Sequence, residues 1–493
     1  MIKDFIKIHD RFAFEVKLEF PVSKGKKKKD SFNFEMFLFL PYSLDVNKHN
    51  FLREDFYRSL KTNIRLTSPH YRLEEVLEGE NAPFEKLKES ILRCRKHPDE
   101  KNLQYAKQQL KKYCSIFGSA LRHAADRINR SKKAENRSRM VSAFILQTKT
   151  LRTSYHKLLP LLIEETGLET LLREYRFADE YQSLLVETHV FGLIKHLQNK
   201  KENHKTDITD LHHLAEQEMD FRDANDYPSV SKPKRSNEEV LHRKSRLKKY
   251  IESNLFLNTQ TRQEGVVTEQ LLFSIAAGLA MVFATAVAFA SQMIYGSLTV
   301  PFFFALVIGY MFKDRIKELV RVYLDKKRKK IHADFKTVIF DQDEKKIGYL
   351  KESFHFEQKN HLPEEVRNAR EMMRTTEMGE VASGDNIIGY KNKTTLYNSK
   401  IHKEEFSGIT QILRFNISDF TRKMDDPEKE VFVRTKKGIK RMLADRVYHL
   451  NLILRYGDSK TLVIKRYKIK ASRNGIKRIE RFKPQNKLTL IKN

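Results

Sequence analysis

The most constraining feature of this chain is a run of 43 residues, 270–312, without one Asp, Glu, Lys or Arg, in a protein in which those residues make up 32%. A bilayer's hydrocarbon core takes about 20 apolar residues per helix, so the run has the length of two spans. Tyr295, Gly296 and Ser297 separate its two apolar halves and are typical of a turn. The pattern predicts a central two-helix transmembrane hairpin at residues 270–312.

The first half of this run is rich in small residues. Ala276, Ala280, Ala284 and Ala288 recur every four residues, so they share one helix face where another backbone can approach closely. We expect the second half of the run to pack there, antiparallel. An oligomeric pore former could use the same stripe. A buried hairpin of a soluble domain would normally show a polar face, which the run lacks.

The charges that flank the run predict its orientation. Residues 231–262 contain nine Lys or Arg and three Asp or Glu, and residues 313–330 contain nine and three again, so each flank carries +6. Basic residues beside membrane spans stay on the cytoplasmic side. The expectation is a multi-pass integral membrane protein with both termini cytoplasmic. The start of the chain lacks the apolar segment of a signal peptide, which favours a bacterial inner membrane.

Composition limits the chemistry that the chain can perform. The only cysteines, Cys94 and Cys114, form neither a CxxC pair nor a zinc quartet, which is typical of a reducing compartment. Phosphate-binding glycine loops and the nucleophile elbow GxSxG are absent from the sequence. No catalytic residue, metal site or cofactor is therefore predicted, and a non-enzymatic role is favoured.

The remainder of the chain predicts an α+β protein. Residues 1–82 form an N-terminal β-hairpin region, since residues 12–20 and 32–40 both alternate apolar and polar side chains. Residues 83–199 show helical periodicity and predict a helical bundle. The other predicted segments are a polar linker at 200–240, basic juxtamembrane helices at 241–269 and 313–335, and a cytoplasmic basic β-rich domain at 336–493.

Two groups of side chains in the helical region resemble incomplete metal sites. The denser group lies in the polar linker and comprises Asp207, Asp210, His212, His213, Glu216 and Glu218. It does not form the HExxH motif, so a solvated acidic helix is the favoured interpretation. His189 and His196 lie seven residues apart on a bundle helix, where histidines more often satisfy polar positions than bind metal.

The C-terminal region predicts a small antiparallel β-meander with a basic surface. Alternating residues from position 447 onward are followed by turns at 457–460 and 474–475. Residues 436–483 contain 16 Lys or Arg and three Asp or Glu, a net charge of +13, with Tyr456, Tyr467 and Phe482 interleaved. Such a surface suits anionic lipid, an acidic protein partner or single-stranded nucleic acid.

The leading hypothesis is a membrane-anchored, cytoplasmic-facing scaffold or regulatory protein, and the alternative is a membrane-tethered nucleic-acid-binding effector that uses the basic C-terminal domain. The expected partners are the lipid bilayer, a protein partner or a second copy of the chain, and, for the alternative, nucleic acid. The residues expected to contact a membrane or a polyanion are Lys26, Lys27, Lys28, Lys29, Lys244, Lys248, Lys249, Lys326, Lys327, Arg328, Lys465, Arg466, Lys468, Lys470, Lys477 and Arg478.

Overall fold

The structure, a computed structural model, describes residues 3–21, 29–79, 82–163, 167–200, 204–230, 237–296, 299–341, 344–372, 384–397, 406–435, 438–457 and 462–482. The chain divides into two compact units. The first comprises Met1–Asn63, Asn258–Ile401 and Gln411–Asn493, and the second comprises Ile64–Leu257 and His402–Thr410. The first unit is therefore assembled from both ends of the sequence.

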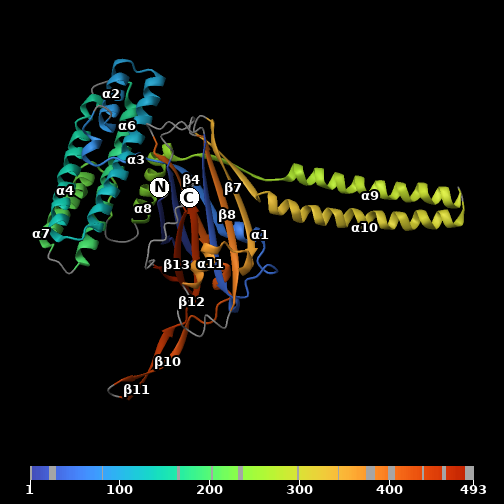
Figure 1. The fold of residues 1–493 in the computed structure, drawn as a ribbon. Coiled ribbons are helices and arrows are strands. Elements are labelled where there is room, and N and C mark those ends of the chain that lie inside the picture. Colours follow the sequence, from blue (N-terminus) through green and yellow to red (C-terminus); the bar gives the residue numbers. More distant parts are fainter. Residues whose placement is uncertain are drawn as a thin grey trace. The chain divides into compact units, whose positions relative to one another are not determined.

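An eight-stranded antiparallel sheet, ordered β14-β13-β12-β3-β8-β7-β6-β5, forms the core of the first unit (Figure 1). Its strands are β3 (Lys29–Pro41), β5 (Asn258–Gln263), β6 (Phe335–Phe340), β7 (Lys346–Glu357), β8 (Asp385–Tyr397), β12 (Tyr448–Gly457), β13 (Leu462–Ser472) and β14 (Gly475–Phe482). β3 is buried on both faces at residues 36–40, because Phe37 and Phe39 are apolar as well as their alternating neighbours. Helix α11 (Glu364–Glu371) packs Val366 and Ala369 against that core.

A smaller sheet is ordered β1-β2-β9-β4. Its strands are β1 (Lys3–Ile8), β2 (Ala13–Pro21), β4 (Leu60–Thr67) and β9 (Gly408–Asn416). The predicted N-terminal β-hairpin is wrong, because β2 pairs with β1 whereas β3 lies in the larger sheet between β12 and β8. Alternation identifies a strand and its buried face, but it does not identify the partner strand.

The remaining strands and short helices complete the first unit. Strands β10 (Glu428–Thr435) and β11 (Gly438–Asp445) pair only with each other in the described part of the chain, as a two-stranded hairpin with exposed apolar side chains. The short helices are α1 (Arg53–Ser59) and α13 (Ser418–Thr421). The α+β class agrees with the sequence prediction, and so does the antiparallel meander, which β12, β13 and β14 form.

Helices make up most of the second unit. They are α2 (Pro83–Lys96), α3 (Glu100–Arg130), α4 (Ala134–His156), α5 (Pro160–Ile163), α6 (Glu169–Gln198), α7 (Lys205–Ala224) and α8 (Asn237–Ile251). The longest of them, α3, begins where the Asp99 side chain accepts a hydrogen bond from the Asn102 N–H. Its buried residues, including Leu110, Phe117 and Leu121, recur at three- and four-residue spacing, which gives one apolar face.

Helix α7 occupies much of the segment that the sequence assigned to a polar linker. It buries Leu211, Leu214 and Ala215, a narrow apolar stripe that the surrounding charges conceal in the sequence. Two of the acidic residues expected to be solvated, Asp207 and Glu218, are buried as well. The Asp207 carboxylate lies 2.9 Å from His204 Nδ1, so its burial is compensated by a polar partner.

A buried ion network joins α4, α6 and α7. Arg152 donates to Asp179 Oδ1 at 2.6 Å and to Glu218 Oε1 at 3.0 Å, and His156 Nε2 lies 3.1 Å from the same Asp179 oxygen. Burial alone would raise the pKa of the Asp179 carboxyl, but the charge of Arg152 and the hydrogen bond with His156 outweigh it and lower that pKa. Ionised Asp179 therefore stabilises the bundle.

Two long helices, α9 (Val266–Tyr295) and α10 (Val300–Ile331), connect β5 to β6 and lie side by side (Figure 1). β5 and β6 are neighbours in the large sheet, with Gln263 opposite Phe335. One more hydrogen bond, from the Glu264 N–H to the Asp334 carbonyl at 3.2 Å, continues the pairing toward the start of α9 and the end of α10. These two helix ends are here called the helix bases. The helical hairpin thus leaves and re-enters the fold at one sheet edge.

The predicted two-helix transmembrane hairpin is wrong. Within the described residues, one helix, α9, is long and apolar enough to cross a membrane, and 11% of its most apolar stretch is buried. α10 is uncharged only over residues 300–312, before charges begin at Lys313. The multi-pass localisation with both termini cytoplasmic, and the inner-membrane assignment that depended on two spans, are wrong with it.

Replacing Asp179 with Asn should destabilise the second unit by about 3 kcal/mol at neutral pH, because part of the Arg152 charge then lacks its buried partner. A carboxyl whose pKa is lowered on folding stabilises above its unfolded pKa of about 3.9, and this stability is lost as the pH falls through the folded pKa. The difference between wild type and variant should therefore shrink in acid. Thermal unfolding from neutral pH to about pH 3 measures it.

The matched control is Asp126→Asn on the exposed face of α3, which should change stability by less than about 0.5 kcal/mol. A pH-independent difference between wild type and Asp179→Asn would contradict the role given to the ionised carboxylate.

Candidate functional site: apolar hairpin and basic pocket

The seam between α9 and α10 is lined by small residues. Ala276 and Ala280 of α9 are buried there, as the predicted stripe indicates. On α10, a Cβ added to Gly309 would lie 3.0 Å from Val287 Cγ1, so the two helices approach closely at this glycine. Because small residues take up much of the seam, many of the large side chains of both helices point outward.

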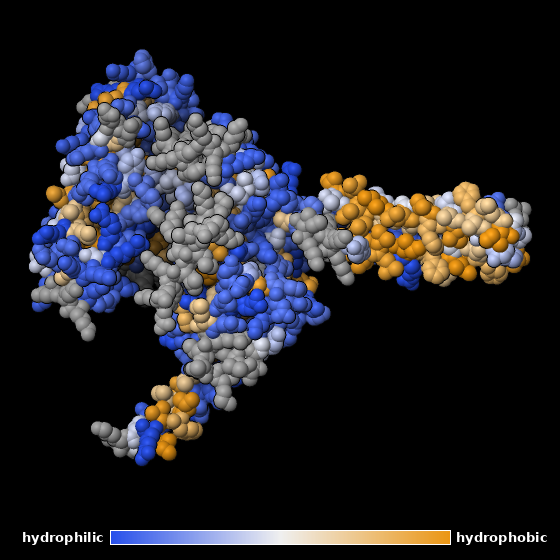
Figure 2. Space-filling model, in the orientation of Figure 1, coloured by the Kyte–Doolittle hydropathy of each residue, from blue (hydrophilic) through white to orange (hydrophobic). Residues whose placement is uncertain are grey.

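The outward face of this helix pair is apolar and exposed. Its large exposed residues in α9 and α10 include Leu279, Val282, Phe289, Met293, Phe303, Phe304, Val307 and Met311. Figure 2 shows hydrophobic surface along much of the pair. Monomeric soluble proteins rarely expose continuous apolar patches of this kind, which mark contact with a membrane or a partner.

The length of the uncharged part of the hairpin follows from the contacts between α9 and α10. Gly309 lies against Val287, and the Arg321 guanidinium lies 4.3 Å from the ring centre of Phe273, so α10 runs antiparallel to α9. These contacts place Lys313, the first charge of α10, about level with residue 283 of α9. From there to the tip the helices rise about 20 Å. A full crossing needs about 30 Å of uncharged length.

The predicted basic residues beside the hairpin have different surroundings. In α8, Lys244 donates to Thr188 Oγ1 at 3.0 Å, and Lys248 and Lys249 are exposed. The side chains of Lys326, Lys327 and Arg328 in α10 lie outside the described residues, as do Lys26, Lys27 and Lys28. Lys29 begins β3, with its ammonium 5.4 Å from the ring centre of Tyr397.

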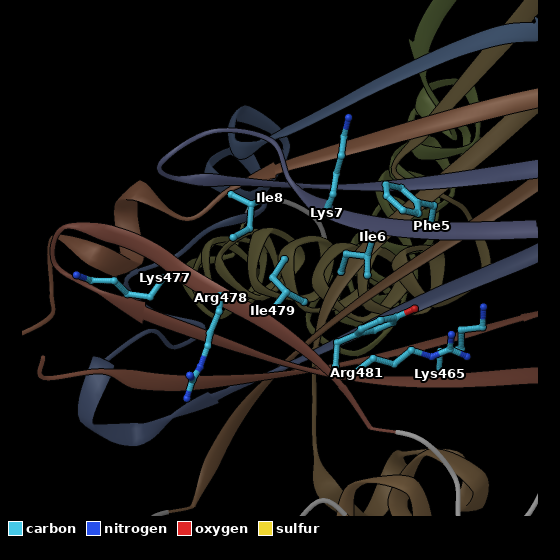
Figure 3. Close-up of a pocket in the computed structure, with 10 residues that line it drawn as sticks. Phe5, Ile6, Lys7, Ile8, Lys465, Lys477, Arg478, Ile479 and Arg481 are labelled. Atoms are coloured by element: carbon cyan, nitrogen blue, oxygen red, sulfur yellow. The ribbon is translucent and has the colours of Figure 1, made fainter. Parts of the chain in front are cut away.

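A separate cavity of about 440 Å³, here called the basic pocket, lies between β1 and the β13–β14 strands (Figure 3). It is lined by Phe5, Ile6, Lys7, Ile8, Lys465, Tyr467, Lys477, Arg478, Ile479 and Arg481. Half of these residues are cations, the other half are apolar or aromatic, and none is acidic. The pocket thus combines a positive rim with an apolar wall.

Strand register decides which of the C-terminal cations reach the pocket. Tyr467 lies opposite Arg481 on the paired strands β13 and β14, so both face the same side. Lys465, two residues before Tyr467, lies on that side as well, and Figure 3 shows it beside Arg481. Of the residues predicted in this region, Lys465 and Lys477 line the pocket. Arg478 also borders it, but it lies opposite Lys470 on the other face and pairs with Glu480 at 2.8 Å.

Hydrogen bonds between the β1–β2 turn and the β13–β14 turn, here called the clasp, hold β1 against these strands. Arg11 Nε donates to the Asn474 carbonyl at 2.5 Å, and the Ile476 N–H donates to the Arg11 carbonyl at 2.7 Å. Gly475 between them has φ +112°, and a Cβ there would lie 2.2 Å from the Arg11 carbonyl oxygen. Only glycine fits that backbone conformation and that approach.

The acidic residues near the pocket are already paired with cations. Glu15 lies 3.3 Å from Lys7 and 2.8 Å from Arg414, and Asp445 lies 2.9 Å from Lys477. Burial alone would raise the pKa of Glu15, but the hydrogen bond from Arg414 and the charge of Lys7 lower it overall. Arg481 is exposed, and no ion pair of the described residues involves it.

The other predicted cations lie on the opposite face of β13. Lys468 is buried with its ammonium 5.4 Å from the Phe482 ring centre, and Lys470 pairs with Glu480 at 3.0 Å. Burial lowers the pKa of Arg466. Conversely, the sequence prediction missed Lys7, Arg481 and the apolar residues of β1. No local signal could have found the β1 residues, because they are more than 450 positions from β13 in the chain.

The interleaved aromatic residues do not form an exposed platform. Tyr456 and Tyr467 are buried, and Phe482 packs beside the core that α11 covers. Sequence-tolerant binding of single strands depends on bases stacking on accessible aromatic rings. The nucleic-acid alternative therefore depends on charge alone.

The described histidines and cysteines show neither a metal-binding cluster nor a reactive thiol. In the described residues, no group of three or more His, Cys, Asp and Glu could hold a metal ion. Burial and the charge of Arg122 lower the pKa of His189 to about 4, so this imidazole is neutral. Cys94 and Cys114 are buried, and burial raises the pKa of both thiols, which disfavours a nucleophilic role.

No protein-family model, curated protein or solved structure matches this chain. Function is therefore inferred from the apolar hairpin and the basic pocket themselves.

Gly475→Ala should lower the free energy of unfolding by about 3 kcal/mol or more, because it adds a collision with the Arg11 carbonyl to the strain of positive φ. The control is Gly438→Ala in the β10–β11 turn, which has φ +117° but nothing within 4 Å of the added Cβ. That change should cost only about 1 kcal/mol. Thermal unfolding of both variants gives the comparison, and equal losses would contradict the clasp.

Proposed function

We propose that this protein is a membrane-anchored scaffold or regulatory protein, attached to a bilayer by the tip half of the α9–α10 hairpin, residues 283–312. The observation that carries the proposal is the exposure of α9, of whose most apolar stretch only 11% is buried. Burying one large apolar side chain is worth about 1.5–3 kcal/mol, so covering several of them gives a strong drive to leave water.

Two ordinary explanations of an apolar helix fit α9 poorly. The core helix of a soluble protein is mostly buried, whereas α9 contacts little besides α10. A signal sequence lies near the start of a chain, whereas α9 begins at Val266. Contact with lipid or with an apolar partner surface is the remaining explanation.

The mode of attachment to the bilayer follows from two features: both helix bases lie at one sheet edge, and the uncharged part of the hairpin is about 20 Å long. Because β5 pairs with β6, both helix bases stay at one sheet edge, so the chain enters and leaves the bilayer from the same side. The uncharged depth of about 20 Å passes one leaflet but not the whole hydrocarbon core. Lys313 and Arg315 then lie where headgroups are, and a cation there is favoured by anionic lipid.

The scaffold part of the proposal concerns the two folded units. Their described residues contain no group of three or more His, Cys, Asp and Glu that could hold a metal ion. Folded units fixed at a membrane can hold a protein partner or a second copy of the chain. Light scattering of the detergent-purified chain measures self-association, and stoichiometric co-purification identifies a protein partner. Bound nucleic acid that weakens steeply with salt would instead support the effector alternative.

Phe289→Lys and Phe304→Lys should each weaken membrane association about a hundredfold, because a charge in hydrocarbon costs roughly 2.5–3.5 kcal/mol. The matched control is Leu146→Lys on α4, where the leucine is 68% exposed, comparable to Phe289 at 64%. Flotation of the purified chain with vesicles measures the bound fraction. Unchanged flotation of both hairpin variants would contradict the anchor.

Tyr295→Cys at the tip of α9 should resist a membrane-impermeant maleimide in vesicles, both intact and opened, since the tip ends within the bilayer. Detergent should restore labelling, because Tyr295 is exposed and the native Cys94 and Cys114 are buried. Labelling only after the vesicles are opened would mean that the tip reaches the far side. Labelling of intact vesicles would mean that the hairpin lies on the surface.

A further inference from the structure

We propose that the basic pocket binds an organic phosphate, with the phosphate on Arg481 and Lys465 and the apolar group of the ligand against Ile6 of β1 and Ile479 of β14. The site is distinct from the α9–α10 anchor, so it stands or falls independently of the proposed function.

The cationic side of the pocket suits a phosphate. Arg481 presents a planar fork of N–H donors that matches two phosphate oxygens, and no carboxylate of the described residues forms an ion pair with it. The side chain of Lys465 extends beside it (Figure 3) and adds a second positive charge. None of the residues that line the pocket is acidic, so an anion meets no repulsion from its walls.

The apolar side of the pocket explains why the ligand should carry more than phosphate. Ile6 on the edge strand β1 is half-buried. Ile479 of β14, also half-buried, lies near it (Figure 3). Inorganic phosphate would leave these side chains in water, whereas a ligand with an apolar or aromatic group would cover them. A cavity of about 440 Å³ has the volume of a small-molecule site.

The clasp keeps this pocket formed without a ligand. The Arg11–Asn474 and Ile476–Arg11 hydrogen bonds hold the β1–β2 turn on the β13–β14 turn. A preformed site loses little entropy on binding, which favours a small ligand with few contacts.

The test uses the full chain in non-ionic detergent with two probes, 1-naphthyl phosphate and inorganic phosphate. Arg481→Ala and Lys465→Ala should each weaken binding of naphthyl phosphate at least about tenfold, because each removes a charged contact. Arg481→Lys should lose less than Arg481→Ala, because it keeps the charge and loses only the fork. Each variant's thermal midpoint confirms that it is folded.

The two halves of the pocket can be separated with a third variant. Ile6→Ala should weaken naphthyl phosphate severalfold and leave the weak binding of inorganic phosphate unchanged, because only the first probe touches the apolar wall. The matched control is Lys359→Ala, an exposed lysine outside the pocket, which removes one charge from the same unit. Binding that is equal in wild type, Arg481→Ala and Lys465→Ala, or weakened as much by Lys359→Ala, would overturn the proposal.

The phosphate could belong to a lipid headgroup or to a soluble phosphoester. Short-chain phosphatidic acid below its micelle concentration should displace naphthyl phosphate from wild type if the source is a lipid. Displacement by a nucleoside monophosphate, and not by the lipid, assigns the soluble source. If neither of them displaces the probe, the site recognises the naphthyl ring and not the phosphate, and the proposal fails.

Discussion

The pairing of β5 with β6 is the constraint on which the hairpin depends. Six residue pairs, from Asn258 opposite Phe340 to Gln263 opposite Phe335, hold the two helix bases at one edge of the large sheet. A helix that crossed a bilayer alone would separate its ends by about 30 Å of hydrocarbon, which this ladder forbids. α9 can therefore be covered by lipid only in company with α10. The charge of Lys313 on α10 then limits how deep both helices can go.

A second constraint is that the large sheet contains strands from both ends of the sequence. β3 lies between β12 and β8, so the sheet cannot form until the N-terminal strand meets strands more than 300 residues later. The same arrangement brings the β1–β2 turn to the β13–β14 turn, where Gly475, which has no side chain, leaves room for the Arg11 carbonyl. The basic pocket is a consequence of that topology. Its apolar wall comes from one end of the chain and its cations mainly from the other.

Sequence patterns predicted the local elements well and their partners poorly. The helical periodicity of residues 83–199 predicts helices, and α2, α3, α4 and α6 lie in that segment, because i to i+4 spacing is a local property. The pairing of β2 and β3 failed because proximity in the sequence was taken as proximity in the sheet. Phe37 and Phe39 carried the contrary signal, since a strand apolar on both faces is typical of a sheet interior.

At both candidate sites, charge counted along the chain does not show how charge is distributed across neighbouring elements. An uncharged run reaches through a membrane only if the helix beside it is uncharged at the same depth, and α10 is charged where α9 still is not. Likewise, neighbouring cations of β13 face opposite sides, so Lys465 reaches the pocket while Lys468 is buried beside Phe482. Because the α9–α10 seam is made of small residues and its bases are fixed by β5 and β6, the hairpin can enter lipid without repacking. The proposed insertion would then change only what surrounds its outward-facing side chains.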